Sequence, residues 1–154
     1  MSKDAEAIVR RWFDEVWNQG REESIDELFA PDAVVYGLGE SDVPIRGPED
    51  FKPFYRNMRA TFPDLHIDID NLVRQDDRIA LCMDIHGTHQ GAGLGIAPTG
   101  RRVHVRGMVI LQVAGGKIAG AQNLWDQLGI LRQIGLVPAP EAEGKDRFFG
   151  EAKA

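Results

Sequence analysis

The side chain best suited to chemistry in this chain is Asp126, which follows the apolar segment GKIAGAQNLW and begins the segment DQLGILRQIG. The first segment has the pattern of a strand and the second that of a short helix. A carboxylate at such a junction can cap the helix. It can also face a cavity lined by the strand, where burial raises the pKa of a carboxyl group towards that of a general acid or base. Both roles are open for Asp126.

The direction of Asp126 follows from the alternation of side chains along a strand. It shares one side with Ile118, Gln122 and Leu124. If that side faces a cavity, Gln122 lies one pleat deeper and can donate a hydrogen bond to a ligand oxygen. Trp125 has the opposite direction and is expected outside the cavity or at a subunit contact.

His89, in the segment GTHQG, follows a strand in which Leu81, Met83 and Ile85 are expected to face inward. The same alternation places His89 on this apolar side, near the mouth of any cavity, with Met83 as a lining residue. A histidine there can polarise a substrate carbonyl or relay a proton. It can equally be a hydrogen-bonded side chain that fixes the glycine-rich loop after it.

A second polar pair, His104 and Arg106, alternates with valines and should face away from them, towards solvent or a dimer interface. We keep His104 as a candidate catalytic residue and Arg106 as a candidate substrate-binding residue. Asp84 and His86 share a polar strand face and are expected to form cross-strand pairs. His86 and His89 are three residues apart in a strand and point to opposite faces, so no metal site is predicted.

The stretch GAGLGIAPTG reads as a loop, because it is rich in glycine and contains a proline. Its glycine spacing matches neither a phosphate-binding loop nor a dinucleotide-binding turn, and strands flank it on both sides. A flexible lid or a rim over a pocket is the better interpretation.

Helical periodicity dominates the first third of the chain. Helices are predicted at residues 4–18, 22–29 and from Pro48 to about residue 62, with Pro53 indicating a late start or a kink in the third. Their aromatic residues are mostly core. Trp17 and Met58 are the candidates for lining a pocket.

From residue 64 the period changes to that of strands, which are predicted at about 65–70, 79–86, 103–113 and 117–125, after an earlier one in AVVYG. A closing helix is expected at 127–134. Helices followed by an antiparallel meander indicate an α+β fold, in which N-terminal helices pack in a strongly curved, mostly antiparallel sheet. Such a sheet forms a cone with an internal pocket. Residues 1–136 are predicted to form one domain and 137–154 a tail, with Phe148 and Phe149 able to dock.

Composition limits the classes of partner. The chain has 154 residues, a formal net charge of −6 and no cluster of Lys or Arg, so neither nucleic acid nor a membrane is an expected partner. Cys82 is the single cysteine, which excludes an intrachain disulfide. The sequence has no signal-peptide pattern and no apolar stretch of about 18–20 residues. A soluble cytoplasmic protein is expected.

Four segments resemble one family. FDEVWNQG, TFPDLHIDIDNLVRQDDRIA, GTHQGAGLGIAPTGRRVHVRG and GGKIAGAQNLWDQLGILRQIG occur in the order found in the SnoaL-like polyketide cyclase (ester cyclase) family, which has the cone-shaped fold of nuclear transport factor 2. The resemblance covers most of residues 8–135. It departs from many relatives at Gly120, where they carry an acidic residue, and at Gln112, where they carry an arginine.

The resemblance implies an enzyme that closes a ring of a polyketide methyl ester by intramolecular aldol condensation, without metal or cofactor. The family uses an Asp at the end of the last strand as general acid/base, and Asp126 occupies the matching place. Gln122 would then hold an enolate oxygen. The implied partner is a hydrophobic small molecule, and the fold commonly forms homodimers.

Two alternatives remain on the same fold. One is a non-catalytic module for binding a hydrophobic small molecule or for dimerisation. The other is an epoxide hydrolase, whose Asp–Arg–Asp set Arg106 and Asp126 could supply in part. The third member has no convincing candidate, because Asp84 is expected to face outward.

Overall fold

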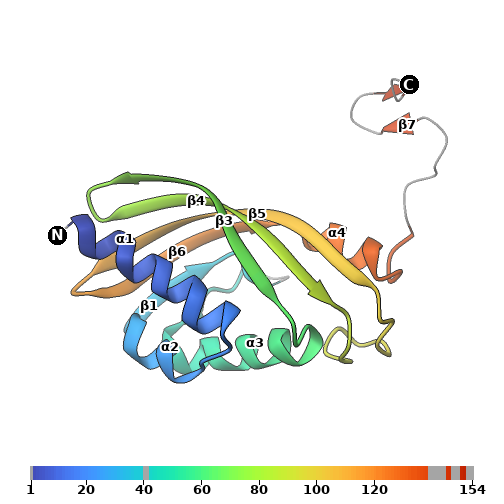
Figure 1. The fold of residues 1–154 in the computed structure, drawn as a ribbon, viewed down its shortest axis with the longest axis horizontal. Helices are drawn as coiled ribbons and strands as arrows, with labels where there is room; N and C mark the ends of the chain where they lie inside the picture. The colour runs from blue at the N-terminus through green and yellow to red at the C-terminus, as the bar shows by residue number, and fades with distance from the viewer. Residues whose placement is uncertain (1, 40–41, 139–144, 147–149, 152–154) are drawn as a thin grey trace.

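The structure is a computed structural model, and it describes residues 2–39, 42–138, 145–146 and 150–151. Helices α1 (Ser2–Arg11), η1 (Trp12–Asn18), α2 (Glu23–Leu28) and α3 (Gly47–Thr61) lie on one side of a six-stranded sheet (Figure 1). A short helix, α4 (Gln127–Gln133), follows the last long strand. The α+β prediction is therefore confirmed.

The first predicted helix changes type at its middle. Residues Ser2–Arg11 are α-helical, whereas Trp12–Asn18 form a π-helix, whose wider turn is rare in proteins. The π segment buries Trp12, Phe13, Val16 and Trp17 together on the core side. It ends at Asn18, and Gly20 follows with a positive φ of 70°, which glycine adopts readily.

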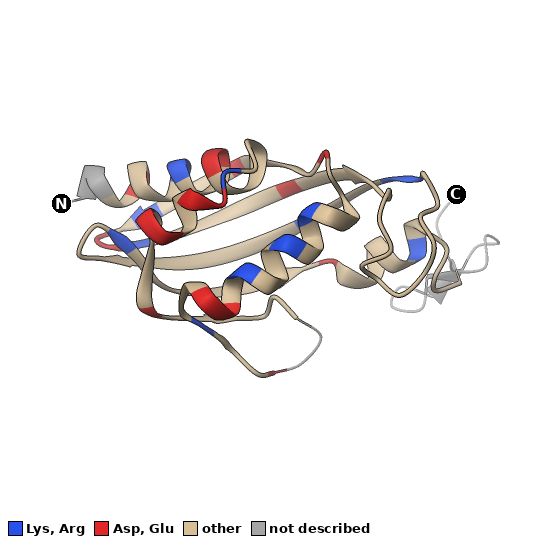
Figure 2. Ribbon diagram, turned by 90° about the horizontal axis from the view of Figure 1, so that it is seen from below, with Lys and Arg blue, Asp and Glu red and all other residues tan. Residues whose placement is uncertain are grey.

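Ion pairs join α2 to α3 on the outer side of the helical layer. Lys52 lies 3.0 Å from Asp26, and Arg56 forms a two-point contact with Glu22. Figure 2 shows the row of basic residues on α3 beside the acidic residues of the neighbouring helix. Helix α3 begins at Gly47 and contains Pro53 in its second turn. It therefore has no late start.

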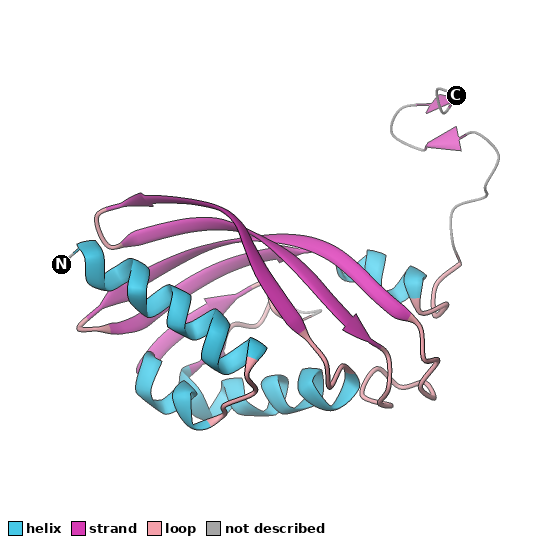
Figure 3. Cartoon of the chain, viewed as in Figure 1, coloured by secondary structure: helices cyan, strands magenta, loops and turns pink. Residues whose placement is uncertain are grey.

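The sheet has the order β2-β1-β6-β5-β4-β3. Its strands are β1 (Phe29–Tyr36), β2 (Ile45–Arg46), β3 (His66–Gln75), β4 (Arg78–Thr88), β5 (Arg102–Ala114) and β6 (Lys117–Trp125). Strands β3 to β6 form the predicted antiparallel meander, and Figure 3 shows the curved sheet over the helices. The parallel pairing of β1 with β6 was not predicted. The sheet is open at both edges, which are β2 and β3.

Two register shifts change which residues face the helices. In β3 the shift falls between Ile69 and Asn71. In β6, Ala119 is an extra residue between the pairs Gln112–Gly120 and Val113–Ile118. The second shift was not predicted, and it decides the direction of every side chain that follows in β6.

The core lies between the concave face of the sheet and the helices. It is formed by the aromatic residues of η1 and α3 and by alternate residues of β4 and β5, such as Leu81, Ile85, Val105 and Leu111. Asn18 ties the two layers together, because its amide exchanges two hydrogen bonds, of 2.9 and 2.7 Å, with the backbone of Ile67 in β3. None of the helices that the structure describes is long and apolar enough to cross a membrane.

Beyond α4, the strands β7 (Lys145–Asp146) and β8 (Gly150–Glu151) pair with each other. The docking predicted for Phe148 and Phe149 lies outside the described residues. The proposed division into a domain of residues 1–136 and a tail stays a prediction.

Candidate active site

The candidate site lies at the end of the sheet where three segments meet. Helix α4 and the loop between β4 and β5 lie at this end (Figures 1 and 2), and the loop contacts the last turn of α3. The contacts are hydrogen bonds from the backbone of Gln90 and Gly91 to Thr61 O and from the Asn57 amide to Gly93 O. The loop is therefore attached to a helix as well as to two strands.

Glycine is required in this loop by close packing. A Cβ atom on Gly91 would lie 2.1 Å from the carbonyl oxygen of Ala60, and one on Gly93 would lie 2.1 Å from the hydroxyl of Thr61. The tip is different, because nothing lies within 4 Å of a Cβ built on Gly95. Of the two predictions, a docked rim fits the base of the loop better than a flexible lid.

His89 is completely buried at the base of this loop. Its Nδ1 lies 3.1 Å from the backbone N of Thr99, which donates to it, and 3.0 Å from the Thr99 hydroxyl. Its own backbone N and O bond to Arg101 and Gly100. The role of fixing the loop, one of the two expected from sequence, therefore has a structural basis. The ring Nε2 is buried and has no hydrogen-bond partner among the described residues.

A row of inward-facing residues crosses the sheet next to this end. Met83, Gly107 and Trp125 are register partners on β4, β5 and β6. A Cβ on Gly107 would lie 2.8 Å from Trp125 Cβ and 3.0 Å from Met83 Cε, so the two side chains fill the space above the glycine. The prediction that Trp125 lies outside the cone is wrong. Its ring packs against the core, and its Nε1 donates to Gly37 O at 3.2 Å.

Trp17 and Met58, the two helical residues predicted to line a pocket, are both buried in the core. Trp17 is surrounded by the rings of Phe51, Phe54 and Tyr55 at centroid distances of 5.3–6.2 Å. Met83 is equally buried on the facing strand. These three side chains share the interior with His89, and their contact with a substrate stays a prediction.

Asp126 is exposed and caps α4. Its Oδ1 accepts a hydrogen bond of 2.8 Å from Gly129 N. The cap depends on glycine at residue 129, because a Cβ there would lie 2.3 Å from Asp126 Oδ2. The structure therefore contains the capping role, and Asp126 does not lie in a buried apolar pocket.

Gln122, Leu124 and Asp126 share one side of the chain, as predicted, but that side is the outer one. Gln122 pairs with Ile110 and Leu124 with Met108, and all four residues are exposed. The cause is the extra residue Ala119 in β6. Ile118, which precedes it, is buried, so the prediction that Ile118 shares a side with Asp126 is wrong. The prediction that Gln122 lies deep in a cavity is therefore wrong.

The same extra residue turns Asn123 inward, which sequence analysis missed. Asn123 pairs with the buried Val109, and its Nδ2 donates to Tyr36 O at 3.1 Å. It is the polar side chain of β6 on the concave face. The signal that could have found it is Gly120, since a glycine inside a strand often marks a bulge.

His104 and Arg106 face outward, as predicted. His104 Nε2 lies 2.9 Å from Asp84, and its ring stacks on His86 at 4.2 Å. Arg106 binds Asp70 and lies 3.6 Å from Asp84. The hydrogen bond from His104 is the main cause that lowers the pKa of Asp84. Asp84 and His86 form the expected cross-strand contacts.

This polar cluster does not join the interior residues. His86 lies on the outer face and His89 inside, as their spacing predicted. Within the described part of the chain, no three His, Cys, Asp or Glu side chains are arranged to hold a metal ion.

A groove of about 850 Å³ runs along the outer face beside the start of α4. Apolar side chains of Met108, Ile110 and Leu124 line it together with Gln122 and Gln127. A smaller and more polar hollow, of about 470 Å³, lies between His86, His104, Arg102 and Gln133. Gln122 thus contributes to a groove, but to one outside the cone.

Comparisons of the sequence and of the structure with known proteins lead to the same family. The model of the SnoaL-like polyketide cyclase family matches residues 7–134. The chain is 27% identical over 138 residues to aklanonic acid methyl ester cyclase DauD of Streptomyces sp. (strain C5), covering 89% of this chain and 84% of that protein. It is 28% identical over 129 residues to the nogalonic acid methyl ester cyclase of Streptomyces nogalater, covering 83% and 95%. A SnoaL-like protein from Jannaschia sp. CCS1 has the same fold, with a TM-score of 0.79, 23% identity and coverage of 89% and 95%.

Proposed function

The chain belongs to the SnoaL-like polyketide cyclase family, and we propose that it closes a ring of a polyketide methyl ester by intramolecular aldol condensation. The observation that carries the proposal is the similarity to two named methyl ester cyclases, which extends over 138 and 129 residues. Those matches are too long to reflect a shared local motif. An aromatic, apolar interior suits a hydrophobic substrate of this kind.

The chemistry needs few protein groups. A base removes the proton from a carbon between two carbonyl groups, the carbanion forms a bond to a ketone carbon, and the ketone oxygen takes up a proton. The product is an isomer of the substrate. Because the substrate itself delocalises the carbanion, one carboxylate is sufficient as general acid/base.

We assign this role to Asp126, at the end of the last strand. Its exposure in the free protein requires that the substrate cover it, since a carboxylate gains basicity when water is removed from it. It immediately precedes α4, and α4 and the docked loop lie at the same end of the sheet. The hydrogen bond to Gly129 occupies one oxygen and leaves the other, Oδ2, for a proton.

The substitutions Asp126→Asn and Gly129→Ala separate catalysis from capping. Asparagine caps a helix as well as aspartate does, so Asp126→Asn keeps the cap and removes the base. Gly129→Ala keeps the carboxylate and disturbs the cap, because the added Cβ meets Oδ2. We expect Asp126→Asn to lower kcat by about 10²–10⁴-fold at unchanged melting temperature. Gly129→Ala should lower the melting temperature and keep most of the activity.

The assay uses aklanonic and nogalonic acid methyl esters and follows the appearance of a product of unchanged mass by chromatography. Exchange of the acidic C–H in deuterated water reports proton removal separately from ring closure. Full activity in Asp126→Asn would contradict the assignment of the base. Binding of both esters without conversion by the unmodified protein would instead favour a non-catalytic binding module.

The epoxide hydrolase alternative gains no support from the geometry. Arg106 does contact two carboxylates, those of Asp70 and Asp84, which supplies the third member that the sequence left open. The cluster is solvent-exposed on the outer face, however, and Asp126 forms no contact with it among the described residues. A water activated there would not be enclosed with a substrate.

A further inference from the structure

A hollow of about 470 Å³ lies on the outer face of the sheet, beside the end of α4. It is lined by His86, Gly87, Arg102, Val103, His104 and Gln133. Its volume is within the range of pockets that hold small organic molecules, about 300–1,000 Å³. It shares no lining residue with the groove of about 850 Å³, and Asp126 does not line it. The hollow is therefore a candidate site distinct from the one assigned to ring closure.

Helix α4 gives this hollow a wall in a fixed position. Strand β6 ends at Trp125, so the part of β5 around His104 is not paired with it. The amide of Gln133 takes the place of a strand there. His104 N donates to Gln133 Oε1 at 2.8 Å, and Gln133 Nε2 donates to His104 O at 2.9 Å. The hollow therefore lies between two elements that hydrogen bonds hold together.

The imidazole rings of His86 and His104 form a flat wall of the hollow. The two residues are register partners on β4 and β5, and their rings stack at 4.2 Å with an interplanar angle of 11°. His104 Nε2 lies 2.9 Å from a carboxylate oxygen of Asp84, which can only accept, so the ring donates this hydrogen bond and is held in place. Flat rings of this kind pack favourably against the face or edge of another ring.

Arg102 brings a positive charge to the opposite side of the hollow. Among the residues that the structure describes, its guanidinium group forms neither a hydrogen bond nor an ion pair. Asp64 attracts Arg102 electrostatically, but its two oxygens accept hydrogen bonds of 2.7 Å each from the backbone N and the hydroxyl of Thr88. The N–H groups of Arg102 are therefore available to an anion from solution.

An arginine next to a flat wall suits a planar acid. The N–H groups of a guanidinium form a planar fork that matches the two oxygens of a carboxylate. The carboxylate of Asp84 does not take this place, because it accepts from His104 and lies 3.6 Å from Arg106. An aromatic acid can put its carboxylate on the fork and its ring against the two imidazoles.

We propose that Arg102, His86 and His104 form a binding site for the carboxylate form of a small aromatic acid. The carboxylate lies at Arg102, and the ring packs against the histidine wall. Binding is non-covalent and requires the negative charge, which distinguishes this ligand from the neutral methyl esters of the proposed reaction. The site does not depend on the cyclase function, so either proposal can fail without the other.

Imidazole resonances can locate the ligand, because the chain contains only four histidines. The probe is benzoate, which is ionised at pH 7. We expect the resonances of His86 and His104, assigned with His86→Asn and His104→Asn, to move along one saturation curve. Those of His89, buried on the other face, should stay in place. Methyl benzoate has the same ring without the charge and should bind at least about 10-fold more weakly.

Two outcomes of this titration would overturn the proposal. If neither His86 nor His104 responds to benzoate, the hollow is not the binding site. If methyl benzoate binds as tightly as benzoate, the carboxylate is not what the hollow recognises.

The substitution Arg102→Gln removes the charge and keeps a long polar side chain. We expect it to weaken benzoate binding by about 10-fold, the effect of losing a hydrogen bond to a charged group. Arg78→Gln is the matched control, because Arg78 is also exposed and lines a separate hollow that contains no histidine. It changes the net charge equally and should leave the affinity unchanged. Equal affinities of the two variants for benzoate would contradict the role of Arg102, and circular dichroism checks that both are folded.

Discussion

Because Gly107 has no side chain, it leaves room for Met83 and Trp125, its partners in the inner row of the candidate site. It lies in the middle of β5, where the neighbouring inward positions are occupied by Val105 and Val109. The space above it is taken by Trp125 Cβ and by the end of the Met83 side chain. A larger residue at 107 would therefore compete with both.

The substitution Gly107→Ala tests this packing. Met83 Cε can move aside, but Trp125 Cβ is fixed to the adjacent backbone only 2.8 Å from the added methyl group. We expect a loss of about 1–3 kcal/mol in the free energy of unfolding, the usual cost of overpacking a core. Urea denaturation measures it. Gly120→Ala, whose Cβ would meet only Val34 O at 3.3 Å, is the matched control and should cost less. Equal stabilities of the two variants would contradict the packing argument.

The alternation of side chains predicted relative directions correctly within an uninterrupted strand, but it failed across the bulge in β6, where Ile118 faces inward and Gln122 outward. Gln122 and Asp126 do share a side, and His104 and His89 lie on the sides expected for them. The choice between inside and outside failed in β6, because one extra residue, Ala119, reverses the faces. A periodic pattern cannot locate such a residue unless the glycine beside it is recognised as a bulge signal.

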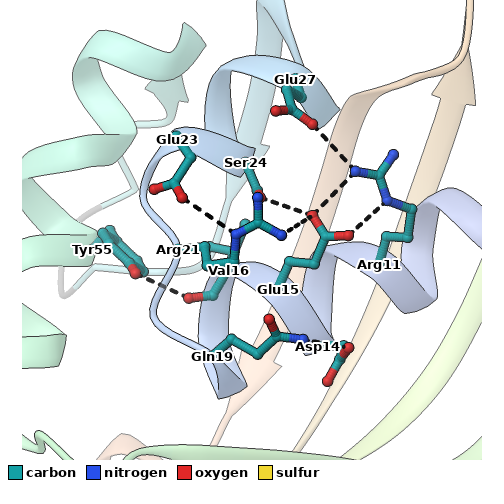
Figure 4. A network of polar contacts seen from close by, with 10 residues as sticks. All are labelled: Arg11, Asp14, Glu15, Val16, Gln19, Arg21, Glu23, Ser24, Glu27 and Tyr55. Carbon is teal, nitrogen blue, oxygen red and sulfur yellow. Dashed lines mark hydrogen bonds and ion pairs between the residues drawn. The ribbon is translucent and has the colours of Figure 1, made fainter.

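At the scale of elements, the π-helix η1 and its contacts to α2 were not predictable from helical spacing. Trp12, Val16 and Phe13 fit an α-helical stripe, and the π segment buries four bulky side chains within seven residues. Figure 4 shows how polar groups stabilise the segment. The hydroxyl of Tyr55 donates to Val16 O at 3.0 Å, and Glu15 accepts from Arg11 and from Ser24 at 2.8 Å each.

Glu15 makes the stability of this region depend on pH. The hydrogen bond from Arg11, followed by that from Ser24, lowers the pKa of Glu15 to about 2. A carboxyl group whose pKa is lowered by folding stabilises the protein above its ordinary pKa, and that contribution is lost as the pH falls towards 2. Glu15→Gln should therefore lower the free energy of unfolding by roughly 1–2 kcal/mol at pH 7.

Urea denaturation of both proteins from pH 7 to pH 3 tests the assignment. The difference between them should begin to shrink below about pH 4.5, the ordinary pKa of the group. Glu23→Gln is the control, since Glu23 is more exposed and its contact to Arg21 is longer, at 3.3 Å. A difference that stays constant down to pH 3 would mean that the charge of Glu15 is not the source of the stability.

At the scale of the whole molecule, the outer face of the sheet carries an apolar band that the fold leaves uncovered. Register partners Tyr36, Gln122, Ile110, Ala80 and Val73 form a row across five strands. Leu124 and Met108 form the next row, with exposed fractions of 81% and 59%. Contiguous apolar surface of this kind marks an interaction site in soluble proteins. The charged cluster around Arg106 and Asp84 continues on the same face and contains both signs of charge.

We expect this face to join two copies of the chain, because a face that carries both charge signs and a central apolar band can pair with itself about a two-fold axis. Such a dimer would bury Leu124 and Met108, so the double substitution Leu124→Asp and Met108→Asp should convert a dimer into a folded monomer. Sedimentation velocity measures the mass, and circular dichroism checks the fold. Val43→Asp, at an apolar residue that is 75% exposed in the loop between β1 and β2, is the control and should remain dimeric.

A monomeric unmodified protein would refute the dimer, whereas a double variant that stays dimeric would place the interface on another face. Because the groove of about 850 Å³ lies on this same face, dimer formation would also cover it.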